Sequence, residues 1–324
     1  MGAMTRFPRC MLGTCCVPWT EAGALDEPRF RRSIRHTLAH GTQHLYVFGT
    51  AGEGYAVNDA QFDRITRVFV EETTAGGGEA MVGVISPSLT TVLARIERAA
   101  ALGVRQVQVS LPSWGACTPA ETRAFFAEVC GRFPGLSFCH YNLRRAGRLV
   151  EPAEYVELAA AHPNLVAVKC GTDSVRYLCD LIVAGTPLRF FFVEQGFAAA
   201  CLLGLEAGLL VSLSSISWTR CRQFFAAGVE GRTEELRRLT GELSDIRQML
   251  FDAVGPAGHM DGSRDKLFAK AHLPEFPLRL LPPYQGSTEA GFERFVRAVR
   301  SRYPHWLDGS AVGEDSMRSG PSGA

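Results

Sequence analysis

The sequence contains no long apolar run, and none of its runs reaches the roughly 18 residues that a membrane-spanning helix needs. It also lacks an excess of one charge, because 34 basic and 33 acidic residues are interspersed and leave a net charge of +1. A nucleic-acid groove or a contact with an anionic membrane would call for a basic patch. We therefore expect a small-molecule partner, with no binding of nucleic acid or membrane.

Signals for export and for metal binding are also missing. The first ten residues have neither an apolar core nor a cleavage pattern, so we expect no signal peptide. The chain has ten cysteines, but none form a Cys-x-x-Cys pair or a Cys/His cluster with zinc spacing. Most lie in apolar runs, where a free thiol behaves as a small hydrophobe. These features predict a reduced, cytoplasmic protein.

What the sequence does contain is a series of eight short apolar or β-rich runs, separated by segments with helical spacing. The runs lie at residues 12–17, 45–48, 81–85, 104–109, 136–141, 165–168, 190–193 and 209–213. Eight strand–helix units of this size are typical of a (β/α)8 TIM barrel, an α/β fold of about 250 residues. A doubly wound open sheet would usually carry a Gly-rich phosphate turn after its first strand, and none is present here.

After the eighth run, the periodicity is only helical. We therefore divide the chain into four parts. They are an N-terminal extension (1–11), the barrel (12–230), a C-terminal helical region (231–308) and a disordered tail (309–324), which is rich in Gly and Ser.

One strand end carries a lysine. Residues 165–168 are apolar and run directly into Lys169, and a Gly-Thr-Asp turn follows. Burial would lower the pKa of this amine, and a neutral amine can attack a carbonyl carbon. The alternative is that Lys169 reaches solvent by its flexible stem. On this stretch alone the alternative is favoured, because lysine is rarely fully buried.

Other polar groups are expected at the same end of the barrel, where TIM barrels carry their active sites. The second strand ends in Gly49-Thr50-Ala51-Gly52, and the fifth ends in Tyr141. Each has an ordinary structural interpretation, as a tight turn and as a half-buried core tyrosine. Together with Lys169 they supply what imine chemistry needs: an amine, a phenol, a hydroxyl and backbone amides that can hold an anion.

These segments carry a resemblance to a known family. Residues 49–53, 141–142 and 166–169 resemble three signature segments of the dihydrodipicolinate synthase and N-acetylneuraminate lyase family, and the similarity extends over most of the chain. Members are barrels with a C-terminal helical region, usually homotetramers. They form a Schiff base between the lysine and pyruvate or a related 2-keto acid.

The resemblance implies a role for each matching residue. Lys169 would form the imine, Tyr141 would shuttle protons and Thr50 would be its relay partner. The amides of Ala51 and Gly52 would hold the keto-acid carboxylate. No metal or organic cofactor would be needed.

The chain also departs from the family pattern. Ala51 stands where a second Thr or Ser is usual. After the fourth strand, Trp114 stands where lysine-forming synthases have a tyrosine. A tryptophan there resembles the hydratase-aldolases, which accept bulky aldehydes. The alternative role for Trp114 is a contact between subunits. Ala146 stands where lysine-forming synthases have an arginine, although Arg144 and Arg145 lie close by. We therefore do not expect efficient lysine-pathway condensation.

The residues expected to shape substrate specificity are Trp114, Arg144, Arg145 and Val211. The predicted function is a Schiff-base-forming lyase or aldolase that acts on a 2-keto acid and an aldehyde. One alternative keeps the imine but leads to dehydration or decarboxylation. Another is an inactive paralogue that binds a keto acid as a regulator or structural subunit, which intact Lys169, Tyr141 and Thr50 disfavour. We expect a homo-oligomer, either a tetramer or a dimer.

Overall fold

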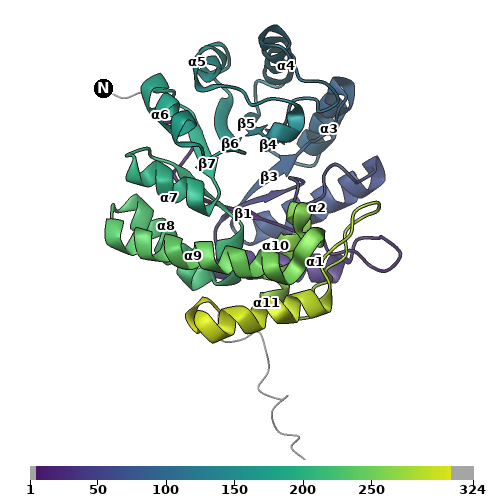
Figure 1. Ribbon diagram of the computed structural model, residues 1–324. Helices are drawn as coiled ribbons and strands as arrows, with labels where there is room; N and C mark the ends of the chain where they lie inside the picture. The colour runs from purple at the N-terminus through teal and green to yellow at the C-terminus, as the bar shows by residue number, and fades with distance from the viewer. Residues whose placement is uncertain (1–4, 308–324) are drawn as a thin grey trace, which may run out of the picture.

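A computed structural model describes residues 5–307, apart from the side chain of residue 257. Eight parallel strands close into a barrel in sequence order, with helices on the outside (Figure 1). The strands are β1 (Met11–Thr14), β2 (His44–Val47), β3 (Glu79–Gly83), β4 (Gln106–Val109), β5 (Ser137–Asn142), β6 (Leu165–Cys170), β7 (Arg189–Phe192) and β8 (Gly208–Val211). The predicted TIM barrel is confirmed. The predicted tail lies outside the described residues.

The helices follow the strands as their spacing predicts. They are α1 (Glu27–His40), α2 (Asp59–Ala75), α3 (Leu89–Ala101), α4 (Pro119–Arg132), α5 (Pro152–Ala161), α6 (Val175–Ala184), α7 (Glu194–Leu202) and α8 (Trp218–Val229). Asn58 and Thr118 form capping boxes at the starts of α2 and α4, which satisfy backbone N–H groups that have no partner within the helix.

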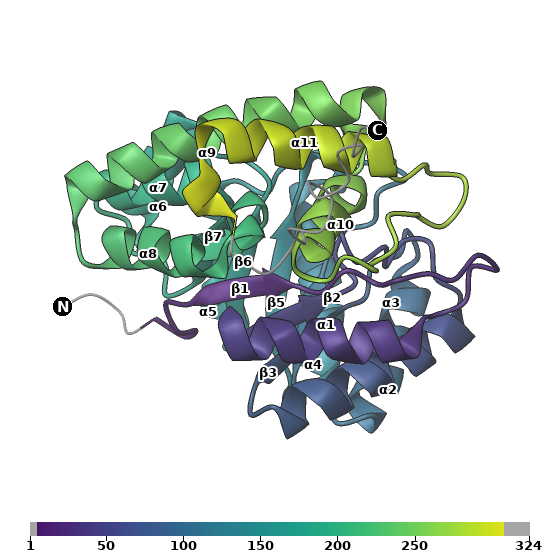
Figure 2. The ribbon, with the colours of Figure 1, turned by 90° about the horizontal axis from the view of Figure 1, so that it is seen from below.

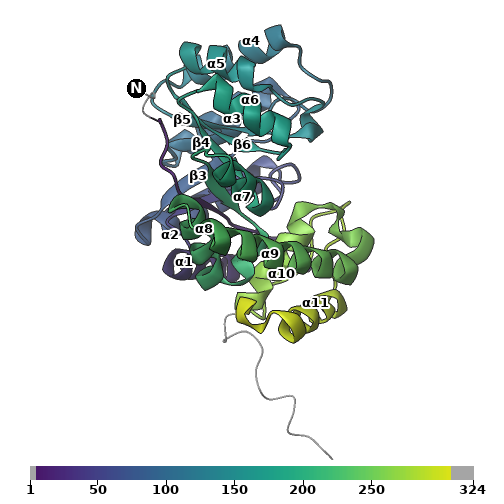
Figure 3. The ribbon, with the colours of Figure 1, turned by 60° about the vertical axis from the view of Figure 1, so that its left-hand side comes forward.

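Three further helices complete the chain: α9 (Thr233–Val254), α10 (Asp261–His272) and α11 (Glu289–Arg302). Helices α9 and α11 pack side by side (Figure 2). The three helices gather on one side of the molecule, away from α4 and α5 (Figure 3). Helix α10 also contacts the short helix η2 (Leu213–Ile216) directly after β8, which brings it to the ends of the barrel strands. Within residues 5–307, no helix has the length and apolar character needed to cross a membrane.

Side chains of the strands alternate between two apolar clusters. On β2, Leu45 and Val47 pack outward with the helices, whereas Tyr46 belongs to a separate cluster with Leu12 and Phe191. Successive side chains of a strand point to opposite faces, so the second cluster fills the barrel interior. Tyr46 is therefore an inward-facing residue.

The end of the barrel where the strands begin is closed by residues that precede β1. Phe7 is buried against His44 and Phe191. The Arg6 guanidinium donates hydrogen bonds to backbone carbonyls at the end of α5 and in β6. Part of the segment predicted as an extension thus packs against the barrel. The end of the barrel that stays open to a small molecule is therefore the opposite one, where the strands finish.

Candidate active site

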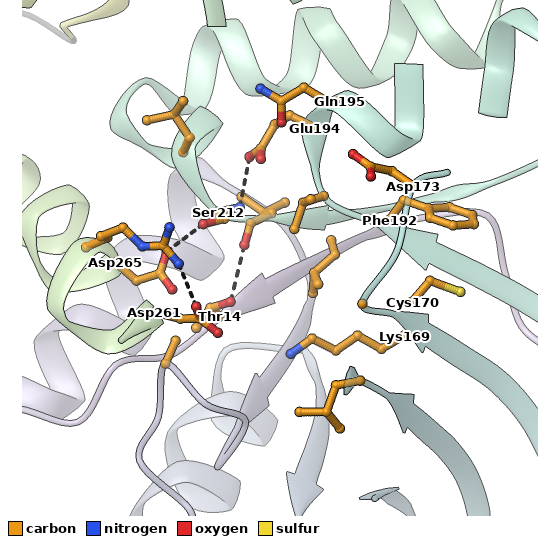
Figure 4. A pocket seen from close by; sticks show the side chains of 18 of the residues that line it. Thr14, Lys169, Cys170, Asp173, Phe192, Glu194, Gln195, Ser212, Asp261 and Asp265 are labelled. Carbon is orange, nitrogen blue, oxygen red and sulfur yellow. Dashed lines mark hydrogen bonds and ion pairs between the residues drawn. The ribbon is translucent and has the colours of Figure 1, made fainter. Parts of the chain in front are cut away.

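A cavity of about 550 Å³ opens where the strands end. Residues from the ends of several strands, and from α9 and α10, form its walls (Figure 4). Many of the residues predicted from the sequence line it: Ala51, Tyr141, Arg144, Arg145, Lys169 and Val211. Thr50 lies directly behind Tyr141, with 3.1 Å between the two hydroxyl oxygens.

Lys169 is held inside the barrel mouth. Every residue of β6 is buried, and Lys169 is only 3% exposed. Its Nζ donates to the Tyr46 hydroxyl at 3.0 Å and lies 4.2 Å and 3.9 Å from the ring centres of Tyr46 and Tyr141. Burial lowers the pKa of Lys169 to about 8, and the negative charge of Asp261 partly opposes this. The alternative in which the amine reaches solvent is therefore wrong.

The turn after β2 leaves room for this amine. A Cβ atom on Gly49 would lie 3.1 Å from Lys169 Nζ and 2.8 Å from the Tyr46 ring. Phe48 and Glu53 bracket the turn, and both have left-handed φ angles, of 63° and 56°. Such strained residues concentrate at functional sites. The turn thus holds its backbone close to the lysine.

The same turn presents backbone N–H groups. Within the described part of the chain, the amides of Ala51 and Gly52 have no hydrogen-bond partner. Ala51 lines the cavity, whereas the backbone of Gly52 packs closely against Phe48. Unpaired amides in a turn can bind an anion such as a carboxylate.

Tyr141 lies between the amine and a hydroxyl relay. It is buried, and burial raises the pKa of its phenol to about 12, so the phenol keeps its proton at neutral pH. The Arg145 guanidinium is 3.5 Å from the Thr50 hydroxyl and 3.4 Å from the Asp261 carboxylate. The pair of Tyr141 and Thr50 can therefore exchange protons with a group bound at Lys169.

Sequence reasoning did not identify two polar residues near Lys169. The Tyr46 hydroxyl contacts both the amine and the Thr14 hydroxyl, which is 2.5 Å away. Both residues line the cavity. The alternation of inward and outward residues in β2 could have identified Tyr46 as an inward polar group near a strand end.

Helix α10 adds carboxyl groups that no local pattern links to the site. Asp265 Oδ1 accepts a hydrogen bond from Ser212 Oγ at 2.6 Å, and Asp261 is paired with Arg264. Asp265 is nearly buried and has no ion pair among residues 5–307. Burial raises its pKa to about 7. Only the packing of α10 against the strand ends brings these groups into the cavity.

Other predicted residues lie elsewhere. Trp114 is 96% exposed and is not part of the cavity wall. Within one chain, Trp114 therefore does not contribute to the acceptor pocket. A contact of Trp114 between subunits stays a prediction. Ala146 is buried beside the cavity-lining Arg144 and Arg145. Arg148, two positions further along the chain, forms an ion pair with Glu154.

Comparisons with known proteins concern the family and the fold of the chain. The family model described as Dihydrodipicolinate synthetase family matches residues 8–258. A 4-hydroxy-tetrahydrodipicolinate synthase of Exiguobacterium sibiricum is 24% identical over 293 residues, which cover 88% of this chain and 94% of that protein. Another, from Xanthomonas axonopodis pv. citri, is 28% identical over 230 residues, covering 70% and 75%.

A similar solved structure is a prophage protein of the dihydrodipicolinic acid synthase family from E. coli K12, in complex with pyruvate. Its TM-score is 0.78 at 18% identity, covering 90% of this chain and 98% of that one, so this similarity concerns the fold. The family match covers all eight strands of the barrel and extends beyond the last one. The chain therefore belongs to the dihydrodipicolinate synthetase family and is a carbon–carbon lyase of the class I aldolase type.

Proposed function

We propose that this chain forms a Schiff base between Lys169 and pyruvate or a related 2-keto acid, and makes or breaks a carbon–carbon bond with an aldehyde. The observation that carries the proposal is the burial of the Lys169 amine and the groups that surround it. Lys169 is buried at the cavity, no carboxylate of residues 5–307 is bonded to it, and it faces Tyr141 and its partner Thr50. A desolvated amine of this kind is a nucleophile near neutral pH.

The proposed chemistry follows from these residues. The keto-acid carboxylate binds to the amides of Ala51 and Gly52, and the Lys169 lone pair attacks the keto carbon. Proton transfers through Tyr141 convert the carbinolamine oxygen to water, which leaves. The resulting iminium draws electrons from the adjacent carbon, which loses a proton to give an enamine. The enamine attacks the aldehyde, and the reverse sequence cleaves the bond. The covalent imine takes the place of an organic cofactor.

The cavity walls beyond Lys169 favour an aldehyde substrate that carries polar groups. Charged side chains from both the barrel and the C-terminal helices line this part: Arg144, Arg145, Asp173, Glu194, Arg247, Asp261, Arg264 and Asp265. Hydroxyl or carboxylate groups on the acceptor would find partners there. The exposed position of Trp114 removes the reason to expect an aromatic aldehyde within one chain. Ala146 still supports an acceptor other than that of lysine-forming synthases.

One observation favours a second outcome of the same imine. Asp265 is a cavity carboxyl with a pKa of about 7, so it can give or take a proton near neutral pH. Removing water from a hydroxylated 2-keto acid needs such a group. Dehydration is therefore the second candidate.

Borohydride trapping across a panel of 2-keto acids tests the proposal. A reduced adduct of the expected mass should map to the Lys169 peptide, as read by mass spectrometry. The chain has three lysines, and Lys270→Arg is a matched control that should retain the adduct. An adduct on Lys266 or Lys270 in the wild-type protein would show that the assignment is wrong.

We also propose a homo-oligomer, either a tetramer or a dimer, in the cytoplasm. Helix α6 exposes several apolar side chains, including Val175 and Val183, and such a surface is typical of a subunit contact. Most of the ten free cysteines are buried, which suits a reducing compartment. Sedimentation of the purified protein tests the assembly, and a monomer at all concentrations would contradict it.

A further inference from the structure

A chain of hydroxyl groups lies behind the Lys169 amine. Lys169 Nζ is 3.0 Å from the Tyr46 hydroxyl, which is 2.5 Å from the Thr14 hydroxyl. Thr14 Oγ1 in turn lies 3.2 Å from the backbone oxygen of Val211 at the end of β8. Tyr46 is only 2% exposed. Four strands therefore contribute to one hydrogen-bonded line that ends at the amine.

The directions of these contacts make the Tyr46 oxygen an acceptor. Lys169 Nζ donates to it at 3.0 Å, and the Thr14 hydroxyl donates to it at 2.5 Å. Thr14 Oγ1 is also within donating distance of the Val211 carbonyl oxygen, which can only accept. A proton cannot leave the cavity by this route, because the carbonyl cannot take one up and pass it on. Tyr46 is thus placed to hold the amine and not to carry protons.

We propose that Tyr46 is a positioning residue that accepts one N–H of Lys169 and so turns the nitrogen lone pair into the cavity. This inference rests on the proposed imine chemistry. A neutral amine has two hydrogens and one lone pair, and fixing one hydrogen restricts where the lone pair can point. Thr14 supports this role by orienting the Tyr46 hydroxyl.

The same contact can persist throughout the reaction. The amine attacks the keto carbon and forms the N–C bond, and one nitrogen proton moves to the former keto oxygen. That oxygen takes up a second proton, which the Tyr141 phenol passes to it, and leaves as water, while the nitrogen becomes a protonated iminium. The iminium keeps one hydrogen, which the Tyr46 oxygen can accept. Every state from amine to iminium thus has a hydrogen for the same acceptor.

The Tyr46→Phe variant separates the hydroxyl from the ring. The ring remains 4.2 Å from Nζ and keeps its attraction for a cation, and only the acceptor is lost. The rate of pyruvate trapping at Lys169 should fall about 10- to 100-fold, the scale of one hydrogen bond to a charged group. The half-saturating pyruvate concentration should change little, because the turn amides are untouched. Tyr303→Phe removes a phenol outside the cavity and should leave the rate unchanged.

A double-mutant cycle distinguishes positioning from packing. Thr14→Val should slow trapping less than Tyr46→Phe does, and Thr14→Ser should restore most of the rate. In the Tyr46→Phe background, Thr14→Val should have no further effect, because Thr14 acts through the lost hydroxyl. Independent, multiplying effects of the two substitutions would overturn the inference.

A second measurement does not depend on any keto acid. Reductive methylation of Lys169 by formaldehyde and cyanoborohydride, followed across pH, reports the pKa of the free amine. Tyr46→Phe removes an acceptor of the ammonium, so the titration of Lys169 should shift to lower pH. An unchanged titration would overturn the role of Tyr46. A wild-type protein that is methylated at Lys169 but forms no pyruvate adduct there would instead contradict the proposed function.

Discussion

The two buried lysines of this chain have opposite surroundings. Lys169 at the end of β6 contacts a neutral phenol oxygen and two aromatic rings. Lys266 on α10 is 0% exposed and contacts the Glu53 carboxylate at 2.6 Å, together with the Arg279 carbonyl. Burial lowers the pKa of both amines, but only Lys266 has a bonded carboxylate that opposes it. The comparison shows that the partner, and not burial alone, separates a structural lysine from a proposed nucleophile.

The Lys266 pair also supports the site. Besides Lys266, Glu53 accepts hydrogen bonds from the Trp19 indole and the Leu281 amide, both at 2.7 Å. Its carboxylate is therefore fully paired, which a buried ion requires. Glu53 ends the turn that presents the amides of Ala51 and Gly52. The pair thus fixes this turn to α10, and α10 in turn carries Asp261 and Asp265 into the cavity.

The largest effect should come from removing the proposed nucleophile. Lys169→Met should abolish borohydride trapping of pyruvate and lower turnover by more than about 1,000-fold, since covalent catalysis has no substitute amine in contact with Tyr141. Mass spectrometry and a turnover assay measure both effects. Lys270→Arg is the matched control. If the Lys169→Met variant still trapped pyruvate, the assignment of Lys169 as nucleophile and Lys266 as structural lysine would be wrong.

Breaking the ion pair of Lys266 and Glu53 should change the stability of the fold. Glu53→Gln leaves the Lys266 ammonium buried without its carboxylate and should lower the free energy of unfolding by about 3–5 kcal/mol. Denaturant titration measures this change. Glu234→Gln breaks an exposed pair with Arg237 and should change the same quantity by less than about 1 kcal/mol. Equal effects of the two substitutions would contradict the structural role of the buried pair.

Lys169→Met should also stabilise the fold. The pKa of Lys169 falls from 10.5 to about 8 on folding, so the unfolded chain binds its proton more readily. This cost of burying the lysine is fully present below pH 8 and disappears as the pH rises towards 10.5. The variant should gain on the order of 3 kcal/mol at pH 7, and the gain should shrink at pH 10. Denaturant titration at the two pH values checks this, and a gain independent of pH would point to packing alone.

The smallest of these effects concerns the hydroxyl pair of Tyr141 and Thr50. Thr50→Val removes the hydroxyl that lies 3.1 Å from Tyr141 and should lower turnover roughly 10- to 100-fold, while the protein still traps pyruvate. Steady-state kinetics and trapping measure the two readouts. Thr66 is a useful control, because its buried hydroxyl has no partner among the described residues. Thr66→Val should therefore leave turnover unchanged, and equal losses would show that Thr50 acts only through packing.

Much of this site follows from local patterns. The apolar run before Lys169 predicts a buried strand, and the Gly-rich segment before Glu53 predicts a turn; both are confirmed. The contact between Thr50 and Tyr141 follows from the rule that strand ends meet on one face of a barrel. The position of Trp114 could not be derived in this way, because a loop has no periodicity that sets its direction.

The sequence by itself determined which segments are strands and helices, their order, and thus the barrel and the residues at its mouth. Those features depend on periodicity and capping within a few residues. Only the tertiary structure decided that Lys169 faces Tyr46 while Lys266 faces Glu53, and that α10 brings Asp265 to Ser212. The physical reason is that a partner, and the pKa it produces, depends on distances between atoms that are far apart along the chain. Lys266 and Glu53 are separated by 213 positions in the sequence but by 2.6 Å in the fold.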